Sequence, residues 1–590
     1  MPPIPAERCI GSRDLSEPRL SRDGSVLVYG EAIAGETAFV VRRGSGSVPA
    51  RIVPTPALRT ARGLGGGSWC FTADEEALIY VAADGNLWLQ PLDGVAACAV
   101  TEHGPDRGVA APCAAPDGEH VVYVVDLAEV YVVDLATRAS VRLDDGRADF
   151  CIDPQVTLDG WVEWVEWDVP DMAWDRSRLH RVRLDGSGRS TLEPSHTVQQ
   201  PRTMPDGRRL SVRDDHGWWN VFVGDAPVVD EPFEHAGPTW GPGQRTFAWS
   251  PDLRSVAFTR NEAGFGRLCM ADIGSGVVRE IARGVHGQLS WGGSRVAALR
   301  TGARTPTQVV AYDTTTWERT VIDVGPAGAW RDDELVEPEA VEVPVDDATA
   351  VVHARLYRAD TSTERLIVWM HGGPTDQWAV TFMPRIAFWR SRGWNVLVPD
   401  HRGSTGHGRS YMQALRGRWG ELDVADIVAV ARWAHEQGWG SPAHSAAMGG
   451  SAGGFTALGA VASAPELFAA AAVAYPVTDL ADLPERSHRF ERHYTVGLVG
   501  PLPARLATYL ERSPAHFPHR FVGTPLLLLH GDSDPVVPVE QSRVFAERVR
   551  AAGGDVELHV YEGEGHGFRD ATHQLDEYAR LEDFLTRNAG

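Results

Sequence analysis

The chain has no lysine, because all 56 of its basic residues are arginine. Schiff-base chemistry, a Walker-type phosphate loop and serine–lysine catalysis each need the ammonium group of a lysine side chain. The missing lysines therefore exclude all three. The 79 acidic residues give a formal net charge of −23. A surface this acidic disfavours nucleic acid and anionic membranes as partners.

Cysteine is scarce as well, with six residues that all lie in the N-terminal half and form no CxxC pair. This pattern favours free thiols in a reducing compartment over a disulfide framework or a zinc site. No segment is long and apolar enough to span a bilayer, and the first residues lack the pattern of a secretion signal. We therefore predict a cytoplasmic protein without metal or cofactor. A homo-oligomer stays open.

A chain of 590 residues is too long for one hydrophobic core, so at least two domains are expected. The first part carries a recurring turn signal, typically Asp-Gly, followed by a β-branched segment. The signal recurs at intervals of 41 to 51 residues, at Asp23, Asp74, Asp117, Asp159, Asp206, Asp252 and Gly293. Several short strands per repeat of this length are typical of a β-propeller blade. The alternative is a β-sandwich or an irregular all-β domain.

The pattern changes near Glu337, where continuous apolar strands begin to alternate with helical segments. Such buried strands separated by helices favour a doubly wound, mostly parallel sheet. We therefore predict a β-propeller, with seven blades, over residues 16–336 and an α/β-hydrolase domain over residues 337–590. Residues 1–15 form a separate N-terminal segment.

The motif Gly449-Gly-Ser-Ala-Gly-Gly454 directly follows an apolar strand and leads into a helix. This is the sharp strand-to-helix turn that exposes a nucleophilic serine, here Ser451. Glycines flank the serine because side chains would clash in so tight a turn. By itself the motif has many false positives, so its interpretation depends on catalytic partners.

Those partners occur in the order expected of an α/β-hydrolase, serine then acid then histidine. Asp534 follows one apolar strand, and His566 follows the last strand. Asp532 is the rival acid, and we favour Asp534 because it lies further along the loop toward the histidine. Together the three motifs predict a Ser451–His566–Asp534 triad. The oxyanion donors are expected at the N–H groups of Ala452 and Gly373, the latter in His371-Gly-Gly-Pro374.

With both parts interpreted, the chain resembles the prolyl oligopeptidase family of serine peptidases, in its acylaminoacyl-peptidase and dipeptidyl-aminopeptidase branch. The resemblance is carried by HGGP, GGSAGG, HGxxD and EGHGF in the hydrolase domain and by the propeller architecture. It implies hydrolysis of short peptides or acyl-aminoacyl amides, with the propeller restricting substrate size. It also implies that residues 1–15 pack on the hydrolase domain.

The resemblance further implies a substrate pocket in the segment after the nucleophile helix. There we expect an apolar wall formed by Tyr475, Val477, Leu480 and Tyr494. Glu491 is expected to anchor a substrate amine. Two alternatives stay open: the apolar residues serve only in core packing, and the glutamate forms only a surface ion pair. The chain departs from the family at Val536, where many members have an arginine that holds a substrate carbonyl. It also has His371 where the prolyl-specific branch has tyrosine.

Two other functions stay open at this stage. The same triad chemistry would serve an esterase or amidase of small metabolites, including aminoacylated natural products. An inactive propeller-type binding module is the third possibility, which an intact set of catalytic motifs disfavours.

Overall fold

The structure is a computed structural model that describes residues 2–11, 13–44, 48–61, 63–104, 106–325, 330–331, 333–346 and 349–590. The chain divides into two compact units. One contains residues 11–327 and 379–382, and the other contains residues 1–10, 328–378 and 383–590. The sequence-based boundaries at 15/16 and 336/337 lie five and nine residues after the contact-based ones at 10/11 and 327/328.

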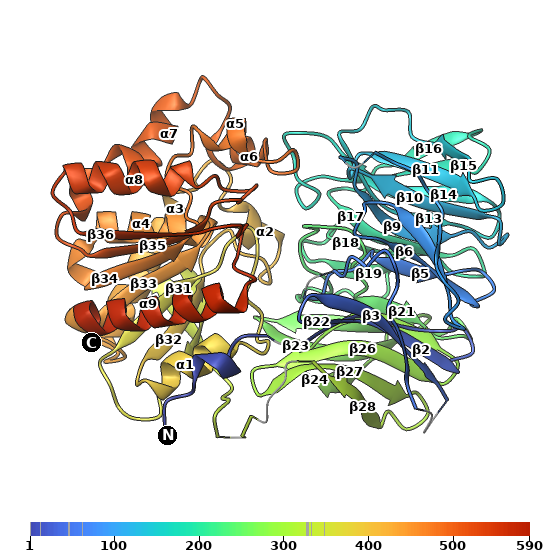
Figure 1. Cartoon of the computed structure of the whole chain (residues 1–590), viewed down its shortest axis with the longest axis horizontal. Helices are drawn as coiled ribbons and strands as arrows, with labels where there is room; N and C mark the ends of the chain where they lie inside the picture. The colour runs from blue at the N-terminus through green and yellow to red at the C-terminus, as the bar shows by residue number, and fades with distance from the viewer. Residues whose placement is uncertain are drawn as a thin grey trace. The chain divides into compact units, whose positions relative to one another are not determined.

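The larger N-terminal unit is a seven-bladed β-propeller, which confirms the predicted architecture. In the described residues, each blade is a four-stranded antiparallel sheet of consecutive strands (Figure 1). The first four blades are β1 (Arg13–Leu20), β2 (Val26–Ile33), β3 (Glu36–Arg43) and β4 (Ala50–Ile52); β5 (Trp69–Phe71), β6 (Ala77–Val81), β7 (Leu87–Pro91) and β8 (Cys98–Ala99); β9 (Val109–Ala114), β10 (His120–Val125), β11 (Glu129–Asp134) and β12 (Ser140–Arg142); β13 (Phe150–Val156), β14 (Trp161–Trp167), β15 (Arg178–Arg183) and β16 (Arg189–Leu192). The last three are β17 (Val198–Thr203), β18 (Arg209–Arg213), β19 (Asn220–Val223) and β20 (Ala226–Pro227); β21 (Phe247–Trp249), β22 (Ser255–Glu262), β23 (Phe265–Asp272) and β24 (Val278–Arg283); β25 (Val285–Gly292), β26 (Arg295–Gly302), β27 (Thr305–Asp313) and β28 (Arg319–Val324).

Each recurring turn signal lies between the first and second strands of a blade. In the first blade the Asp23 carboxylate accepts hydrogen bonds from the Ser25 N–H at 2.9 Å and from the Ser21 hydroxyl at 2.6 Å. Gly24 follows with φ of 75°, a conformation that glycine adopts without strain. Where the glycine is missing, Glu75 and Leu253 adopt positive φ in its place. The repeat in the sequence is therefore a repeated hairpin turn.

The ring is closed between the first and last blades without exchange of a strand. Leu20, Leu27 and Tyr29 of the first blade pack with Leu299 and Val309 of the last. An ion pair reinforces this apolar contact. The Arg13 guanidinium donates to both carboxylate oxygens of Asp323 at 2.7 and 2.8 Å, and the Tyr29 hydroxyl donates to the same carboxylate at 2.6 Å.

Asp323→Ala is expected to destabilise the propeller by about 1 to 3 kcal/mol, because it leaves two partly buried donors without their acceptor. Burial alone would raise the pKa of Asp323, but Arg13 and Tyr29 hold it below its usual value. The stabilisation is therefore present at neutral pH and is lost as the pH falls through that lowered pKa. Urea unfolding of the full chain measures it, with Glu318→Ala on the exposed face of the same blade as control. Equal midpoints for the two variants would contradict the assignment.

The second unit is built on an eight-stranded sheet with strand order β29-β30-β32-β31-β33-β34-β35-β36. Six neighbouring strands of this sheet run parallel to one another, namely β32, β31, β33, β34, β35 and β36. At one edge, β29 pairs antiparallel with β30, and β30 pairs antiparallel with β32. The strands are β29 (Glu339–Val345), β30 (Ala350–Tyr357), β31 (Leu366–Met370), β32 (Asn395–Asp400), β33 (Ser445–Gly450), β34 (Ala470–Ala474), β35 (Leu526–Gly531) and β36 (Val556–Tyr561). The predicted doubly wound α/β-hydrolase fold is confirmed.

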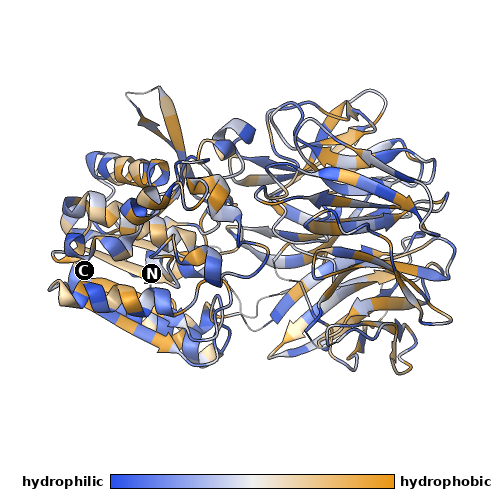
Figure 2. Cartoon of the chain, turned by 90° about the horizontal axis from the view of Figure 1, so that it is seen from above, coloured by the Kyte–Doolittle hydropathy of each residue, from blue (hydrophilic) through white to orange (hydrophobic). Residues whose placement is uncertain are grey.

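Helices cover both faces of this sheet (Figure 1). Helices α3 (Leu422–Glu436), α4 (Ala452–Ser463) and α8 (Glu540–Ala551) share one core with alternate residues of the strands. Helices α1 (Pro384–Ser391) and α9 (Ala571–Ala589) lie on the other face. The helices of this unit alternate hydrophilic and hydrophobic residues along their length, as amphipathic helices do (Figure 2). The remaining helices are short: α2 (Arg409–Gln413), α5 (Leu483–Arg486), α6 (Tyr494–Val499), α7 (Leu506–Arg512) and the 3-10 turns η1 (Ala6–Arg8), η2 (Pro442–His444), η3 (Pro465–Leu467), η4 (Pro514–His516) and η5 (Pro518–Phe521).

The start of the chain packs on the hydrolase unit. The Ile4 N–H donates to the Ser391 hydroxyl at 2.9 Å, and the Arg8 guanidinium forms two hydrogen bonds with the Glu334 carboxylate at 2.9 and 2.8 Å. Ile4 itself is buried. These contacts end before Arg13, where the first propeller strand begins.

Candidate active site

Ser451 occupies the sharp turn between β33 and α4. Its backbone has φ of 56° and ψ of −126°, a strained conformation for a residue with a side chain. The turn closes so tightly that a Cβ on Gly449 would lie 2.3 Å from the Gly453 carbonyl oxygen. A Cβ on Gly453 would lie 2.4 Å from the carbonyl oxygen of His371. The glycines of the motif are therefore required by close backbone approach.

Asp534 and His566 meet at the ends of the adjacent parallel strands β35 and β36. The Asp534 carboxylate accepts a hydrogen bond from His566 Nδ1 at 2.7 Å. Its other oxygen accepts from the N–H groups of Val536 and Val537 at 2.8 and 2.9 Å. Burial alone would raise the pKa of Asp534, but His566 and these two N–H groups hold it below its usual value. The carboxylate is therefore ionised at neutral pH.

The rival acid Asp532 makes different contacts. It accepts hydrogen bonds from the Ser533 hydroxyl at 2.9 Å and from the Gly563 N–H at 2.8 Å. The structure thus pairs the histidine with the acid that the sequence favoured. The loop that carries His566 is braced by Glu564, which accepts from the N–H groups of Arg569 and Asp570 at 2.9 and 2.8 Å.

Ala452 and the His371–Pro374 loop surround the nucleophile turn. Ala452 is the first residue of α4, so its N–H is one of those that have no partner within the helix. The helix dipole adds partial positive charge at that end. A Cβ on Gly372 would lie 3.6 Å from the Ser451 Cβ, and Gly373 next to it has φ of 118°. The loop with the second predicted donor therefore lies beside the serine.

His371 orients this loop through two hydrogen bonds. Its Nδ1–H donates to the Gly372 carbonyl at 2.7 Å, so Nε2 accepts from the Ser404 hydroxyl at 2.7 Å. Burial, assisted by the neighbouring His401, lowers the pKa of His371 to about 4, so the ring is neutral. Nothing in the sequence indicated Ser404 as a partner, because it lies 33 residues away on another loop.

Of the predicted pocket residues, Tyr475 lies against the candidate triad. Its ring centroid is 4.5 Å from that of His566, and a Cβ on Gly450 would lie 3.0 Å from the same ring. Tyr475 therefore contacts both the histidine and the turn that carries Ser451. Burial raises the pKa of its hydroxyl to about 12, so the phenol is neutral.

The other predicted pocket residues are held in packing or in surface contacts. Val477 and Leu480 are buried, with 3% and 0% exposure. The Tyr494 hydroxyl donates to the Thr375 hydroxyl at 2.5 Å and accepts from the Thr375 N–H at 3.1 Å, which braces the loop after Pro374. A carboxylate oxygen of Glu491 lies 3.3 Å from His488 Nε2. Their roles as an apolar wall and an amine anchor stay predictions.

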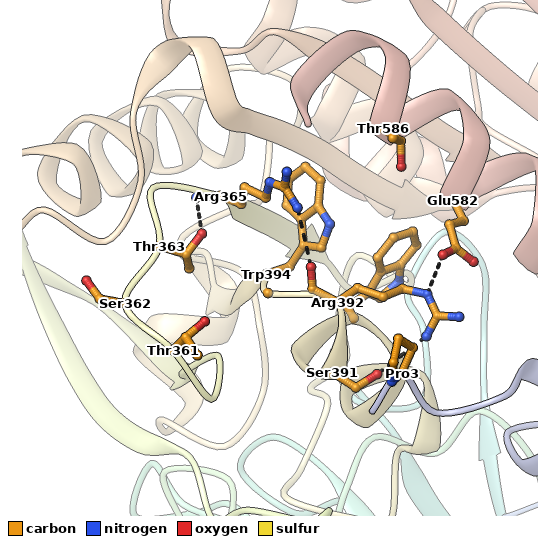
Figure 3. A pocket seen from close by; sticks show the side chains of 12 residues that line it. Pro3, Thr361, Ser362, Thr363, Arg365, Ser391, Arg392, Trp394, Glu582 and Thr586 are labelled. Carbon is orange, nitrogen blue, oxygen red and sulfur yellow. Dashed lines mark hydrogen bonds and ion pairs between the residues drawn. The ribbon is translucent and has the colours of Figure 1, made fainter. Parts of the chain in front are cut away.

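A separate pocket of about 510 Å³ lies on the hydrolase unit between the first residues of the chain, α1 and α9 (Figure 3). Its walls include Arg365, Arg392 and Glu582. Arg392 is already paired, with Glu582 at 2.7 Å and with the Ile4 carbonyl at 2.9 Å. We assign this pocket no part in the chemistry.

Two kinds of feature are absent from the described part of the chain. Within those residues no group of three or more His, Cys, Asp or Glu side chains is arranged to hold a metal ion. None of the helices described is both long and apolar enough to cross a membrane.

The sheet order, the strained serine turn and the paired acid and histidine define an α/β-hydrolase domain. Comparison with known proteins shows what this domain is similar to. Residues 380–590 match the model of the prolyl oligopeptidase family. The similarity to this family that the motifs predicted is therefore confirmed for the hydrolase domain.

Relatives of known name extend this comparison. The chain is 28% identical over 244 residues to dipeptidyl peptidase family member 6 of Caenorhabditis elegans, covering 40% of this chain and 33% of that protein. It is 30% identical over 211 residues to the acylamino-acid-releasing enzyme of Arabidopsis thaliana, covering 34% and 27%. The matched part thus spans a third or less of these curated relatives. A puromycin-hydrolyzing peptidase of Mycobacterium tuberculosis superposes with a TM-score of 0.89 at 27% identity, covering 100% of this chain and 97% of that one.

Proposed function

We propose that the protein is a serine peptidase that hydrolyses short peptides or acyl-aminoacyl amides through an acyl-enzyme on Ser451. The observation that carries the proposal is the hydrogen bond from His566 Nδ1 to the ionised Asp534 carboxylate. Because Nδ1 keeps its proton, Nε2 of the neutral ring is an acceptor. It can therefore take a proton from a serine hydroxyl.

The remaining groups fit the same reaction. Ser451 attacks the scissile carbonyl, and the N–H groups of Ala452 and Gly373 stabilise the oxyanion, a contribution of a few kcal/mol per donor. His566 then protonates the leaving amine, and water releases the acyl group by the reverse proton transfers. Asp534 holds the ring orientation and stabilises the imidazolium.

The comparisons support a peptide substrate. A full-length structural relative is a puromycin-hydrolyzing peptidase, and the curated relatives include an acylamino-acid-releasing enzyme. As part of the proposal, the propeller restricts substrates to short peptides, and the enzyme works in the cytoplasm. All six cysteines are unpaired, which suits a reducing compartment.

A substrate panel tests the proposal against the esterase alternative. It contains acyl-aminoacyl and aminoacyl p-nitroanilides, puromycin, p-nitrophenyl esters, and peptides of increasing length. We expect hydrolysis of amides with an upper limit in peptide length. Cleavage of the esters alone would favour a metabolite esterase. Failure to react with a fluorophosphonate probe would favour an inactive binding module.

A further inference from the structure

The first strands of several blades share a feature that is independent of the hairpin turns. First strands of neighbouring blades contact one another, for example β1 with β25 and β9 with β13, which places them nearest the propeller axis. Several contain a β-bulge whose first residue has positive φ and is followed by proline. These are Glu17-Pro-Arg19, Ala111-Pro-Cys113, Asp153-Pro-Gln155 and Gln200-Pro-Arg202, with Gln288-Leu-Ser290 as a variant without proline. A β-bulge changes the direction in which the side chains of a strand point. Here these side chains lie within the propeller interior.

Two of these bulge residues hold glycine-rich segments in the interior. The Glu17 carboxylate accepts hydrogen bonds from the N–H groups of Gly67 and Ser68 at 2.9 and 3.0 Å. The Asp153 carboxylate accepts from the Gly243 N–H at 2.6 Å. The two segments touch, since a Cβ on Gly243 would lie 2.0 Å from the Gly67 nitrogen. Both interior carboxylates are therefore engaged by backbone N–H groups.

Three arginines surround these segments, and two of them have unused hydrogen-bond donors. Arg202 donates to the Gln244 and Phe247 carbonyls at 2.6 and 3.3 Å. Arg19 is 6% exposed and pairs with Glu17 at 2.9 Å, yet its Nε and Nη1 atoms have no hydrogen-bond partner in the described structure. For Arg245, the described residues supply neither a hydrogen bond nor an ion pair to the guanidinium.

The positive charge of this cluster is not balanced locally. Burial, and then the proximity of Arg19 and Arg202, lowers the pKa of Arg245 well below its usual value. The carboxylates that act on it are Glu17 and Asp153, and burial raises the pKa of Asp153. Cys70 and Cys113 also lie nearby, and burial raises the pKa of Cys70 to about 12 and that of Cys113 above its usual value. The thiols are thus neutral, which leaves three cations facing at most two carboxylates.

We propose that this cluster is a binding site for a small tetrahedral oxyanion of the phosphate or sulfate class, held by the free donors of Arg19 and Arg245. Guanidinium groups bind such anions through paired N–H donors, and buried charge without a counter-ion is strongly unfavourable. Arg245 is half-buried, so part of its surface is accessible. The site is independent of the proposed peptidase chemistry, and its occupant would stabilise the propeller.

Thermal unfolding of the full chain tests the site, with inorganic phosphate or sulfate titrated against chloride at constant ionic strength. An anion that binds only the folded state raises Tm by an amount that grows with the ratio of its concentration to Kd. For the wild type we expect a rise of about 5 °C at a hundredfold excess over Kd. No rise with either anion would overturn the proposal.

Arg245→Met removes the unpaired cation with little loss of volume. We expect this variant to unfold at a higher temperature than the wild type in anion-free buffer and to lose the response to phosphate. Arg147→Met, whose native side chain is 87% exposed, is the matched control and should respond like the wild type. An equal response of Arg245→Met and the wild type would overturn the site. If Arg245→Met does not fold, crystals of the wild type soaked in selenate give a second test. We expect an anomalous peak beside Arg19 and Arg245. The absence of this peak at saturating selenate would overturn the site.

Discussion

Ser451→Ala is expected to lower kcat for a chromogenic peptide amide by about six orders of magnitude, because it removes the atom that forms the acyl-enzyme. The residual rate above the uncatalysed reaction would come from the oxyanion donors and from substrate binding. Alanine fits the same turn, since the flanking glycines already provide the space that the backbone needs. Steady-state kinetics with an acyl-aminoacyl p-nitroanilide measure the loss.

Ser463→Ala is the matched control, because Ser463 is an exposed serine at the other end of the same helix. It should retain wild-type kcat and fluorophosphonate labelling, whereas Ser451→Ala loses both. Tm should be close to the wild-type value for the two variants. Amide hydrolysis by Ser451→Ala at more than about one hundredth of the wild-type rate would show that another nucleophile does the chemistry.

The hairpin turns made the propeller predictable, because turn chemistry is local. Asp23 and its counterparts accept hydrogen bonds from residues two positions away, so each repeat carries its own signal. Most of the interior bulges share only a proline, and the residues on either side of it differ from blade to blade. Their partners lie on loops far apart in sequence, as Asp153 and Gly243 do.

Within the hydrolase unit, the apolar strands were predictable and the atypical ones were not. Strand β34, Ala470–Ala474, has four alanines and one valine. Alanine has low strand propensity, so this segment becomes a strand because its neighbours β33 and β35 offer hydrogen bonds on both sides. The antiparallel pair β29 and β30 likewise lies outside the α/β alternation on which the prediction rested.

In the candidate site too, some features could be predicted from the sequence and others could not. The serine motif, the acid and the histidine could be found because each follows a strand, and the parallel sheet brings strand ends together. Two other contacts could not be found in this way, that of His371 with Ser404 and that of Tyr494 with Thr375. They join loops that come close to each other only in the complete fold. Substrate selectivity belongs to this second group, so Val477, Leu480 and Glu491 stay predictions.

Asp534→Asn is expected to lower kcat by about four orders of magnitude with little change in KM. The amide of asparagine can donate to His566 Nδ1, which would leave the proton on Nε2 and remove the base that Ser451 needs. Asp532→Asn is the matched control, because this neighbouring acid contacts Ser533 and Gly563 rather than the histidine. It should retain kcat within a few-fold.

The stability of the same variants distinguishes the two acids further. The pKa of Asp534 is lower in the folded protein than in the unfolded chain, whose aspartates titrate near about 3.9. Its ionised form therefore stabilises the fold above that pH, and the contribution is lost as the pH falls through the lower, folded value. The wild type should unfold at a higher urea concentration than Asp534→Asn at pH 7, with the gap closing in acid. A gap that stays constant with pH, or an Asp532→Asn variant as inactive as Asp534→Asn, would contradict the assignment of Asp534 as the residue that orients the histidine.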